Sequence, residues 1–166
     1  MSRPRIDHIG IIVGDLDAAA ASMARMLPGA PVRRRSLPDA GLEVAEFAAA
    51  NLIIELLEYT DAGDGFGRAV MGPAVGVNHL SLGVPDLDAA LAALREHGVE
   101  PMDGFPRPGA HGRIAFLPRD EDTGLLFELC EAEGQEEMEG NRVEEQKVEE
   151  RKVEEHGDTT EKTEAP

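Results

Sequence analysis

The sequence predicts an α+β fold built from two tandem modules, each with the element order β-α-β-β-β. The first reason is an internal repeat, because residues 6–19 are matched, 71 positions later, by residues 77–90. The second is that residues 52–58 and 125–131 are similar apolar runs, each with a central and a final glutamate. A glutamate inside a buried strand is costly unless its charge is compensated, so the repeated pattern indicates one site shared by both modules.

The first module begins with residues 6–13, a short run rich in Ile and Val that predicts a buried strand. Asp15 precedes an alanine-rich run and is a typical N-cap, and Pro28 with Gly29 ends the predicted helix. Three further strands are expected at residues 30–36, 42–49 and 52–58, with a turn at residues 38–41.

The second module repeats this plan after a Gly-rich loop at residues 61–73, in which one helical turn is expected near residues 66–70. Asp86 is the expected N-cap of a helix that ends at Gly98. The expected elements are a strand at 77–84, a helix at 87–97, a strand near 99–104, a loop at 106–112, and strands at 113–118 and 124–131.

The length of 166 residues allows one domain, which we place at residues 5–131, with modules at about 5–60 and 76–131. The net charge of −17 argues against a nucleic-acid partner, because nothing would neutralise phosphates. A single cysteine, Cys130, excludes a disulfide framework and fits a reducing compartment. No run is long enough to cross a membrane, so we expect a cytoplasmic protein without a membrane partner.

Residues 132–166 differ in composition from the rest of the chain, with 13 acidic against 5 basic residues. They contain a five-residue near-repeat with one valine per unit, which is too little apolar surface to bury. We therefore expect an acidic, disordered or transiently helical tail.

Two histidines and two glutamates form the candidate site: His8, Glu55, His79 and Glu128. A single histidine in a strand is more often a core residue, and a single glutamate is usually edge-exposed, but matched pairs in a duplicated fold favour a divalent metal site. Nitrogen and carboxylate donors of this kind suit Co²⁺, which is our first choice, and also Ni²⁺, Mn²⁺, Zn²⁺ or iron. Two open positions on a six-coordinate ion would accept a chelating substrate.

These paired modules resemble the vicinal oxygen chelate superfamily of glyoxalase I, bleomycin-resistance proteins, extradiol dioxygenases and methylmalonyl-CoA epimerases. Within it, residues 5–131 are most similar to the epimerases, through the loop at 106–112 (Pro-Arg-Pro-Gly-Ala-His-Gly) and the run at 127–131 (Phe-Glu-Leu-Cys-Glu). The resemblance implies a curved mixed sheet around the metal site, and a metal that holds the thioester and carboxylate oxygens of an acyl-CoA substrate. The small size of the chain suggests a homodimer, since such small modules tend to pair.

The implied reaction is removal of the α-proton of methylmalonyl-CoA, formation of an enolate, and return of a proton on the opposite face, which needs two acid/base groups. Glu128 is our first choice for one. Some family members use a glutamate where this chain has Val44. Glu46, two residues on, faces the same side of a strand and is our hypothesis for the second group. The alternative is that Glu46 is a solvated edge residue.

Substrate contacts are expected at two places. His111 and Gly112 lie in the Gly-containing loop near the mouth of the site, and Arg33 and Arg34 belong to a basic cluster that could hold phosphates of coenzyme A. A charged edge strand that discourages aggregation would explain the same cluster.

Two other functions remain open. A glyoxalase I-type lactoylglutathione lyase shares the ligand set, and a non-catalytic bleomycin-resistance-like binding protein shares the fold, although such proteins usually lose the ligands. An extradiol dioxygenase needs two histidines and one carboxylate, which would leave Glu55 without a role.

Overall fold

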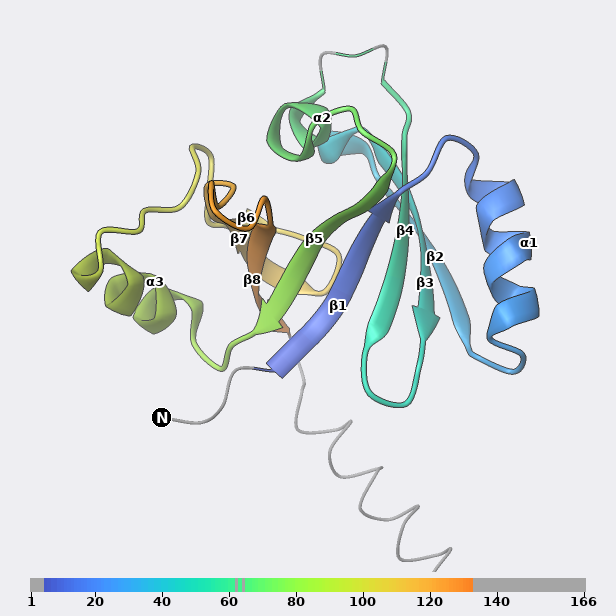
Figure 1. The fold of residues 1–166 in the computed structure, drawn as a ribbon, viewed down its shortest axis with the longest axis horizontal. Coiled ribbons are helices and arrows are strands. Elements are labelled where there is room, and N and C mark those ends of the chain that lie inside the picture. The colour runs from blue at the N-terminus through green and yellow to red at the C-terminus, as the bar shows by residue number, and fades with distance from the viewer. Residues whose placement is uncertain (1–4, 62, 64, 133–166) are drawn as a thin grey trace, which may run out of the picture. The chain divides into compact units, whose positions relative to one another are not determined.

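The computed structural model describes residues 5–61, 63 and 65–132, and the predicted tail lies outside these residues apart from Ala132. The described chain forms one eight-stranded mixed sheet with the order β2-β3-β4-β1-β5-β8-β7-β6 (Figure 1). The strands are β1 (Arg5–Ile12), β2 (Val32–Leu37), β3 (Leu42–Ala48), β4 (Ile53–Tyr59), β5 (Gly76–Gly83), β6 (Arg107–Pro108), β7 (Gly112–Phe116) and β8 (Leu126–Ala132). The helices are α1 (Leu16–Met26), the 3₁₀ turn η1 (Pro38–Ala40), α2 (Phe66–Met71) and α3 (Leu87–Glu96).

The predicted fold class and nearly all predicted elements are confirmed, but the strand expected near residues 99–104 is wrong. Pro101 and Pro106 cannot donate to a ladder, and Gly104 has a positive φ of 85°. Only Met102 bonds to the sheet, through its N–H to the carbonyl of Phe116 at 2.8 Å. The short strand β6 forms instead within the predicted loop.

The strand pairing shows the duplication directly. The two modules meet where β1 pairs antiparallel with β5, and each of these strands pairs in parallel with the last strand of its own module, β1 with β4 and β5 with β8. The register places Gly10 beside Glu55 and Ser81 beside Glu128. Since positions 10 and 81 correspond in the repeat, both glutamates occupy equivalent places in the sheet.

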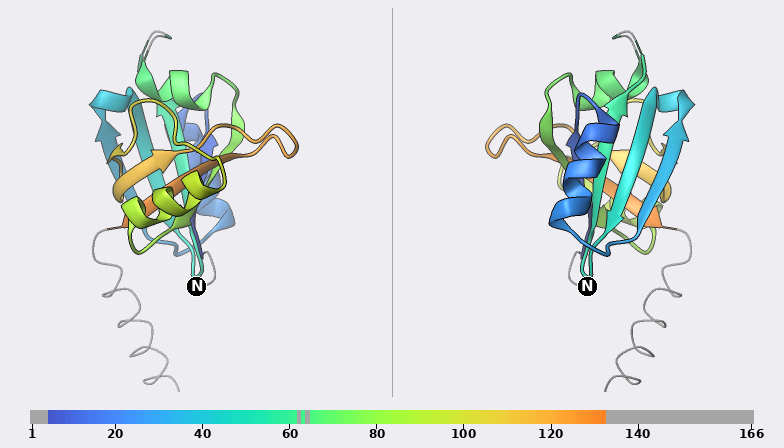
Figure 2. Two further views of the ribbon diagram at one scale, coloured as in Figure 1. Left: turned by 90° about the vertical axis from the view of Figure 1, so that its left-hand side faces the viewer. Right: turned by 90° about the vertical axis from the view of Figure 1, so that its right-hand side faces the viewer.

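The helices α1 and α3 cover the outer face of the sheet, one over each module (Figure 2). Each begins at the predicted N-cap, because Asp15 accepts from the N–H of Ala18 and Asp86 from that of Ala89, both at 2.8 Å. In each module, a glutamate side chain from the last strand also accepts a hydrogen bond from the first N–H of the helix. Glu58 bonds to Leu16 at 3.1 Å and Glu131 to Leu87 at 3.2 Å.

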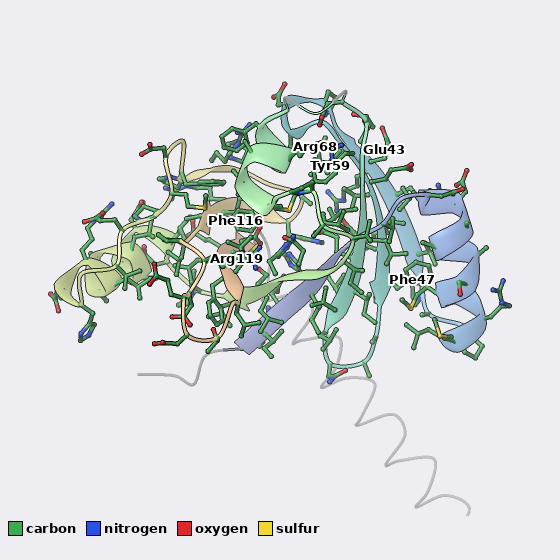
Figure 3. All side chains as sticks on the ribbon, turned by 45° about the horizontal axis from the view of Figure 1, so that its top comes forward. Glu43, Phe47, Tyr59, Arg68, Phe116 and Arg119 are labelled. Carbon is green, nitrogen blue, oxygen red and sulfur yellow. The ribbon has the colours of Figure 1, made fainter. Side chains whose placement is uncertain are left out.

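The side chains of the strands alternate between the two faces of the sheet. On the outer face of β3 and β4, Phe47 and Leu56 pack against α1 (Figure 3). On the inner face, Val44 and Leu57 pack with Phe116 of β7 in a second cluster. None of the described helices is long and apolar enough to cross a membrane. The sheet curls around its inner face (Figure 1), and this is where the polar side chains collect.

Candidate active site

Five neighbouring strands, β3, β4, β1, β5 and β8, each contribute one buried histidine or glutamate to the inner face. All five side chains are buried, with no more than 4% of each residue exposed. In strand order they are Glu46, Glu55, His8, His79 and Glu128. We call these residues the polar row.

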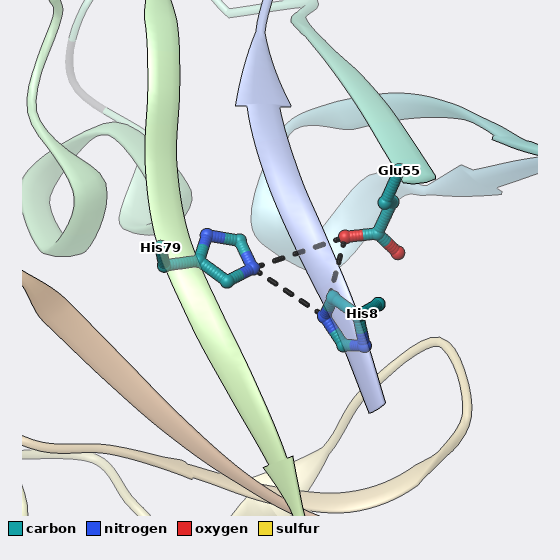
Figure 4. Close-up of side chains that lie close together, drawn as sticks. All are labelled: His8, Glu55 and His79. Atoms are coloured by element: carbon teal, nitrogen blue, oxygen red, sulfur yellow. Dashed lines mark hydrogen bonds and ion pairs between the residues drawn. The ribbon is translucent and has the colours of Figure 1, made fainter. Parts of the chain in front are cut away.

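The centre of the polar row brings both modules together (Figure 4). Nε2 of His8 lies 3.4 Å from Nε2 of His79 and 3.7 Å from Oε2 of Glu55. The same carboxylate oxygen is 4.0 Å from Nε2 of His79. Glu128 joins from the other side, with Oε1 at 3.3 Å from Nε2 of His8. His8, Glu55 and His79 therefore form one cluster of donor atoms, and Glu128 adjoins it through His8.

Both imidazoles are oriented by the residue that precedes them in the chain. Nδ1 of His8 lies 3.2 Å from a carboxylate oxygen of Asp7, and Nδ1 of His79 lies 3.2 Å from the amide oxygen of Asn78. The amide group of Asn78 is fixed because its nitrogen donates to the carbonyl of Met71 at 2.9 Å. Because these oxygens can only accept, Nδ1 is the protonated nitrogen of both rings and Nε2 faces the site, which is the usual arrangement of metal-binding histidines.

The electrostatics of the site favour a cation between the imidazoles. Burial lowers the pKa of His8, but the hydrogen bond to Asp7 and the charges of Glu128 and Glu55 outweigh it and raise the pKa to about 9. Burial and the positive charge on His8 lower the pKa of His79 to about 3. Two imidazole Nε2 atoms at 3.4 Å repel each other unless a proton or a metal ion lies between them.

The two carboxyl groups are affected mainly by burial. Burial raises the pKa of Glu55 to about 7, against the opposing charge of His8. Burial also raises the pKa of Glu128, although His8 and the hydroxyl of Ser81, which donates to Oε1 at 2.8 Å, act in the opposite direction. A divalent cation would compensate both carboxylates.

The donor set fits such a cation. One donor atom each of His8, Glu55 and His79 lies within 4.8 Å of the others, and all three residues are buried. The backbone is shaped to admit the His79 ring, because a Cβ at Gly10 would lie 2.1 Å from Cε1 of that ring. Glycine at position 10 thus leaves room for the His79 side chain of the other module.

The Glu46 end of the polar row has a different set of neighbours. Oε1 of Glu46 lies 2.9 Å from Nε of Arg35 and 3.5 Å from Nε2 of His111. His111 also approaches Oε1 of Glu55 at 3.8 Å. Burial lowers the pKa of His111, and the charge of Glu46 opposes this shift. Since Glu46 is only 4% exposed, it is not a solvated edge residue.

A cavity of about 240 Å³ opens over the polar row. Its polar lining includes His8, Glu55, His79, Glu128 and His111. Its apolar lining includes Leu57, Phe66, Met71, Phe105 and Phe116. Glu46 does not line it. The volume is below the ~300–1,000 Å³ of pockets that enclose a whole ligand, so the cavity suits a small polar group attached to a larger molecule.

Comparison with known proteins identifies the family. Residues 7–116 match the Glyoxalase/Bleomycin resistance protein/Dioxygenase superfamily. The chain belongs to this superfamily. It is 35% identical over 128 residues to the ethylmalonyl-CoA/methylmalonyl-CoA epimerase of Cereibacter sphaeroides, over 75% of this chain and 96% of the relative. It is also 32% identical over 136 residues to the uncharacterized protein YqjC of Bacillus subtilis, over 81% of this chain and 97% of that protein.

A solved structure has the same fold. It is a methylmalonyl-CoA epimerase in complex with methylmalonyl-CoA and NH₄⁺, with a TM-score of 0.66 and 32% sequence identity. The match covers 80% of this chain and 97% of that one. The resemblance to the superfamily and its glyoxalase-like fold are thereby confirmed.

Apart from His111, the residues predicted to contact substrate do not line the cavity. Arg34 pairs with Asp17 of α1 at 2.7 Å, and neither Arg33 nor Arg34 lines the cavity. Gly112 begins β7, and its carbonyl accepts from the N–H of Gly109 at 2.7 Å. Of the loop residues predicted to contact substrate, only His111 lines the cavity.

Sequence reasoning missed several residues that support the site. Asp7 and Asn78 orient the histidines, Ser81 binds Glu128, and Gly10 makes room for His79. All four lie within the repeat, next to or two residues from a predicted ligand. The sequence does carry a signal for these residues. They are polar or small, and they stand in strands whose other positions are mostly Ile, Leu or Val.

Proposed function

We propose that this protein epimerises methylmalonyl-CoA by removing its α-proton, with an enolate as the intermediate and a divalent metal ion as cofactor. The observation that carries the proposal is the position of Glu128, a buried carboxyl group beside the three clustered donors His8, Glu55 and His79 and at the wall of a cavity. The named activities of two relatives, the Cereibacter sphaeroides enzyme and the solved structure with bound methylmalonyl-CoA, support the substrate.

His8, His79, Glu55 and Glu128 would hold the ion, for which Co²⁺ is our first choice and Ni²⁺, Mn²⁺ and Zn²⁺ are alternatives. The ion would supply positive charge that stabilises the negative charge that develops on the thioester oxygen. Asp7 and Asn78 keep both Nε2 atoms directed at it.

Glu128 is the proposed acid/base group at one end of the polar row. Burial raises its pKa above the usual value of a glutamate, the direction that suits a group that both accepts and returns a proton. Its Oε1 accepts from Ser81, which fixes the carboxyl group in the wall of the cavity. Inversion at the α-carbon requires a second group on the opposite face, and the Glu46 end of the row supplies it.

The cavity would enclose the acyl group and leave coenzyme A outside, because its volume of about 240 Å³ is too small for the whole molecule. Arg107 lines the cavity, and its guanidinium lies 4.1 Å from the centre of the Phe66 ring. It is therefore better placed than Arg33 or Arg34 to meet the part of an acyl-CoA that leaves the cavity.

The test is deuterium incorporation at C2 of methylmalonyl-CoA in D₂O, followed by NMR with the Co²⁺-loaded protein. We expect metal-dependent exchange that Glu128→Ala reduces by at least about 100-fold. The same samples are assayed for conversion of the glutathione hemithioacetal of methylglyoxal. Lyase activity without C2 exchange would contradict the epimerase proposal and indicate a glyoxalase I-type enzyme. Neither activity in protein with confirmed bound Co²⁺ would also contradict it.

A further inference from the structure

The second acid/base group of the proposed epimerisation has to reach the substrate, and Glu46 does not line the cavity. His111 does, and it stands between Glu46 and the open space, with Nε2 at 3.5 Å from Oε1 of Glu46. The imidazole, rather than the Glu46 carboxyl group, is therefore placed to contact a ligand in the cavity.

Two carboxylates lie beside one nitrogen of the His111 ring. Nε2 faces Oε1 of Glu46 at 3.5 Å and Oε1 of Glu55 at 3.8 Å, and this nitrogen is buried without a hydrogen bond to the described residues. Nδ1 likewise makes no hydrogen bond within the described part of the chain. A carboxylate behind one imidazole nitrogen and a reacting atom before the other is the arrangement that orients a histidine for proton transfer.

One arginine connects the partner of His111 with the loop that carries it. Nε of Arg35 lies 2.9 Å from Oε1 of Glu46, and Nη1 of Arg35 donates to the carbonyl of Ala110 at 2.7 Å. The loop is closed by the bond from the N–H of Gly109 to the carbonyl of Gly112 at 2.7 Å. Arg35 thus holds Glu46 and fixes the backbone next to His111.

Glu46, Glu55 and His111 also have donor atoms within 4.8 Å of one another, so a second metal ion has to be considered. The guanidinium of Arg35 already places a positive charge against Glu46 at 2.9 Å. A cation at this point would repel it, whereas a neutral imidazole would not.

We propose that His111 is the second acid/base residue, acting across the cavity from Glu128, and that Glu46 and Arg35 are positioning residues that orient it. The proposal rests on the proposed epimerisation. In each turnover one of the two groups takes the α-proton from one face of the α-carbon, and the other donates a proton to the opposite face. No electrons are transferred, and exchange of protons with solvent returns both groups to their starting protonation states before the next turnover in the same direction.

The experiment follows C2 exchange in D₂O separately from the two epimers of methylmalonyl-CoA, with the full-length Co²⁺-loaded protein. We expect His111→Ala to lower the rate of epimerisation by about 100-fold or more. The variant should still exchange the C2 proton of the epimer whose α-proton Glu128 removes. It should no longer exchange the C2 proton of the other epimer. Added imidazole should restore the lost exchange. His97→Ala, at the exposed C-cap of α3, is the control and should not respond to imidazole.

Metal content separates this role from a ligand role. Wild type and His111→Ala should each bind one Co²⁺ per chain with similar affinity. Glu46→Gln should lower kcat about tenfold without changing KM, because it removes the charge that orients the ring but leaves the cavity intact. Three results for His111→Ala would each overturn the proposal. They are an equal loss of exchange from both epimers, the loss of a second bound ion that the wild type holds, and epimerisation as fast as in the wild type. If wild type exchanges neither epimer, the proposed function itself fails.

Discussion

At the scale of single residues, the site depends on which atom of each side chain faces inward. The sequence showed that two histidines and two glutamates recur at matched positions, and the structure brings all four together. It did not show that Asp7 and Asn78 turn Nε2 of both rings toward the same point. That depends on side-chain torsions, and a repeat in the sequence carries no information about them.

The pKa of His8 predicts how stability changes with pH. It is raised from 6.5 to about 9, so the stability that this proton contributes is fully present below pH 6.5 and is lost as the pH rises through 9. His79, lowered to about 3, and Glu55, raised to about 7, titrate mainly below pH 7. In EDTA, unfolding by urea should show a loss of up to about 3 kcal/mol between pH 7 and 9.

The metal should reverse this trend, because binding requires the deprotonated Nε2 of His8. The stabilisation by Co²⁺ should therefore increase from pH 7 to 9. His8→Gln provides the control, since it should remove the pH dependence in EDTA. Equal urea midpoints for the metal-free wild type at pH 7 and 9 would contradict the prediction.

A second prediction at this scale concerns Gly10. A Cβ there would lie 2.1–2.5 Å from three atoms of the His79 ring, so Gly10→Ala must displace a proposed metal ligand. We expect Co²⁺ affinity, measured by calorimetry, to fall at least about tenfold. Gly14→Ala is the matched control, because nothing lies within 4 Å of a Cβ at that position. Similar Co²⁺ affinities for the two variants would show that the site tolerates the displacement.

At the scale of elements, the repeat predicted the central strands and both helices, because period and capping are local properties. The edge of the second module was not predictable in the same way. Residues 99–106 contain apolar residues as a strand would, but Pro101, Gly104 and Pro106 prevent a continuous ladder. The sequence also shows that each repeated run ends in a glutamate. That these glutamates accept a hydrogen bond from the first N–H of a helix depends on the distance between strand and helix, which the sequence does not give.

Those two glutamates give a prediction for the helices. Glu58 bonds to the N–H of Leu16, and Glu131 to that of Leu87. Replacing either with glutamine should lower the free energy of unfolding by about 1 kcal/mol, because a charged acceptor is lost at a helix N-terminus. Urea denaturation measures this, with the exposed Glu121→Gln as the control. An effect no larger than that of the control would mean that the aspartate caps suffice alone.

At the scale of the whole molecule, the site residues come from both modules, so neither module alone contains the site. All of them lie between Asp7 and Glu128, within the part of the chain that the structure describes. Removing residues 133–166 should therefore leave Co²⁺ binding and kcat/KM for epimerisation unchanged within about twofold. A larger loss in the truncated protein, compared with full-length protein at equal metal content, would assign the acidic segment a role in the reaction.

The pairing of the two modules across β1 and β5 has a consequence for the relative rates of the forward and reverse reactions. The two epimers of a substrate differ only in the face of the α-carbon that carries hydrogen, so neither direction has a large driving force. A planar enolate lying along the pseudo-twofold axis would turn its opposite faces toward equivalent strands of the two modules. Such a catalyst has no built-in preference between the two hands of its substrate. In the proposed reaction His111 and Glu128 face opposite sides of that enolate, so any preference would have to come from the difference between an imidazole and a carboxyl group.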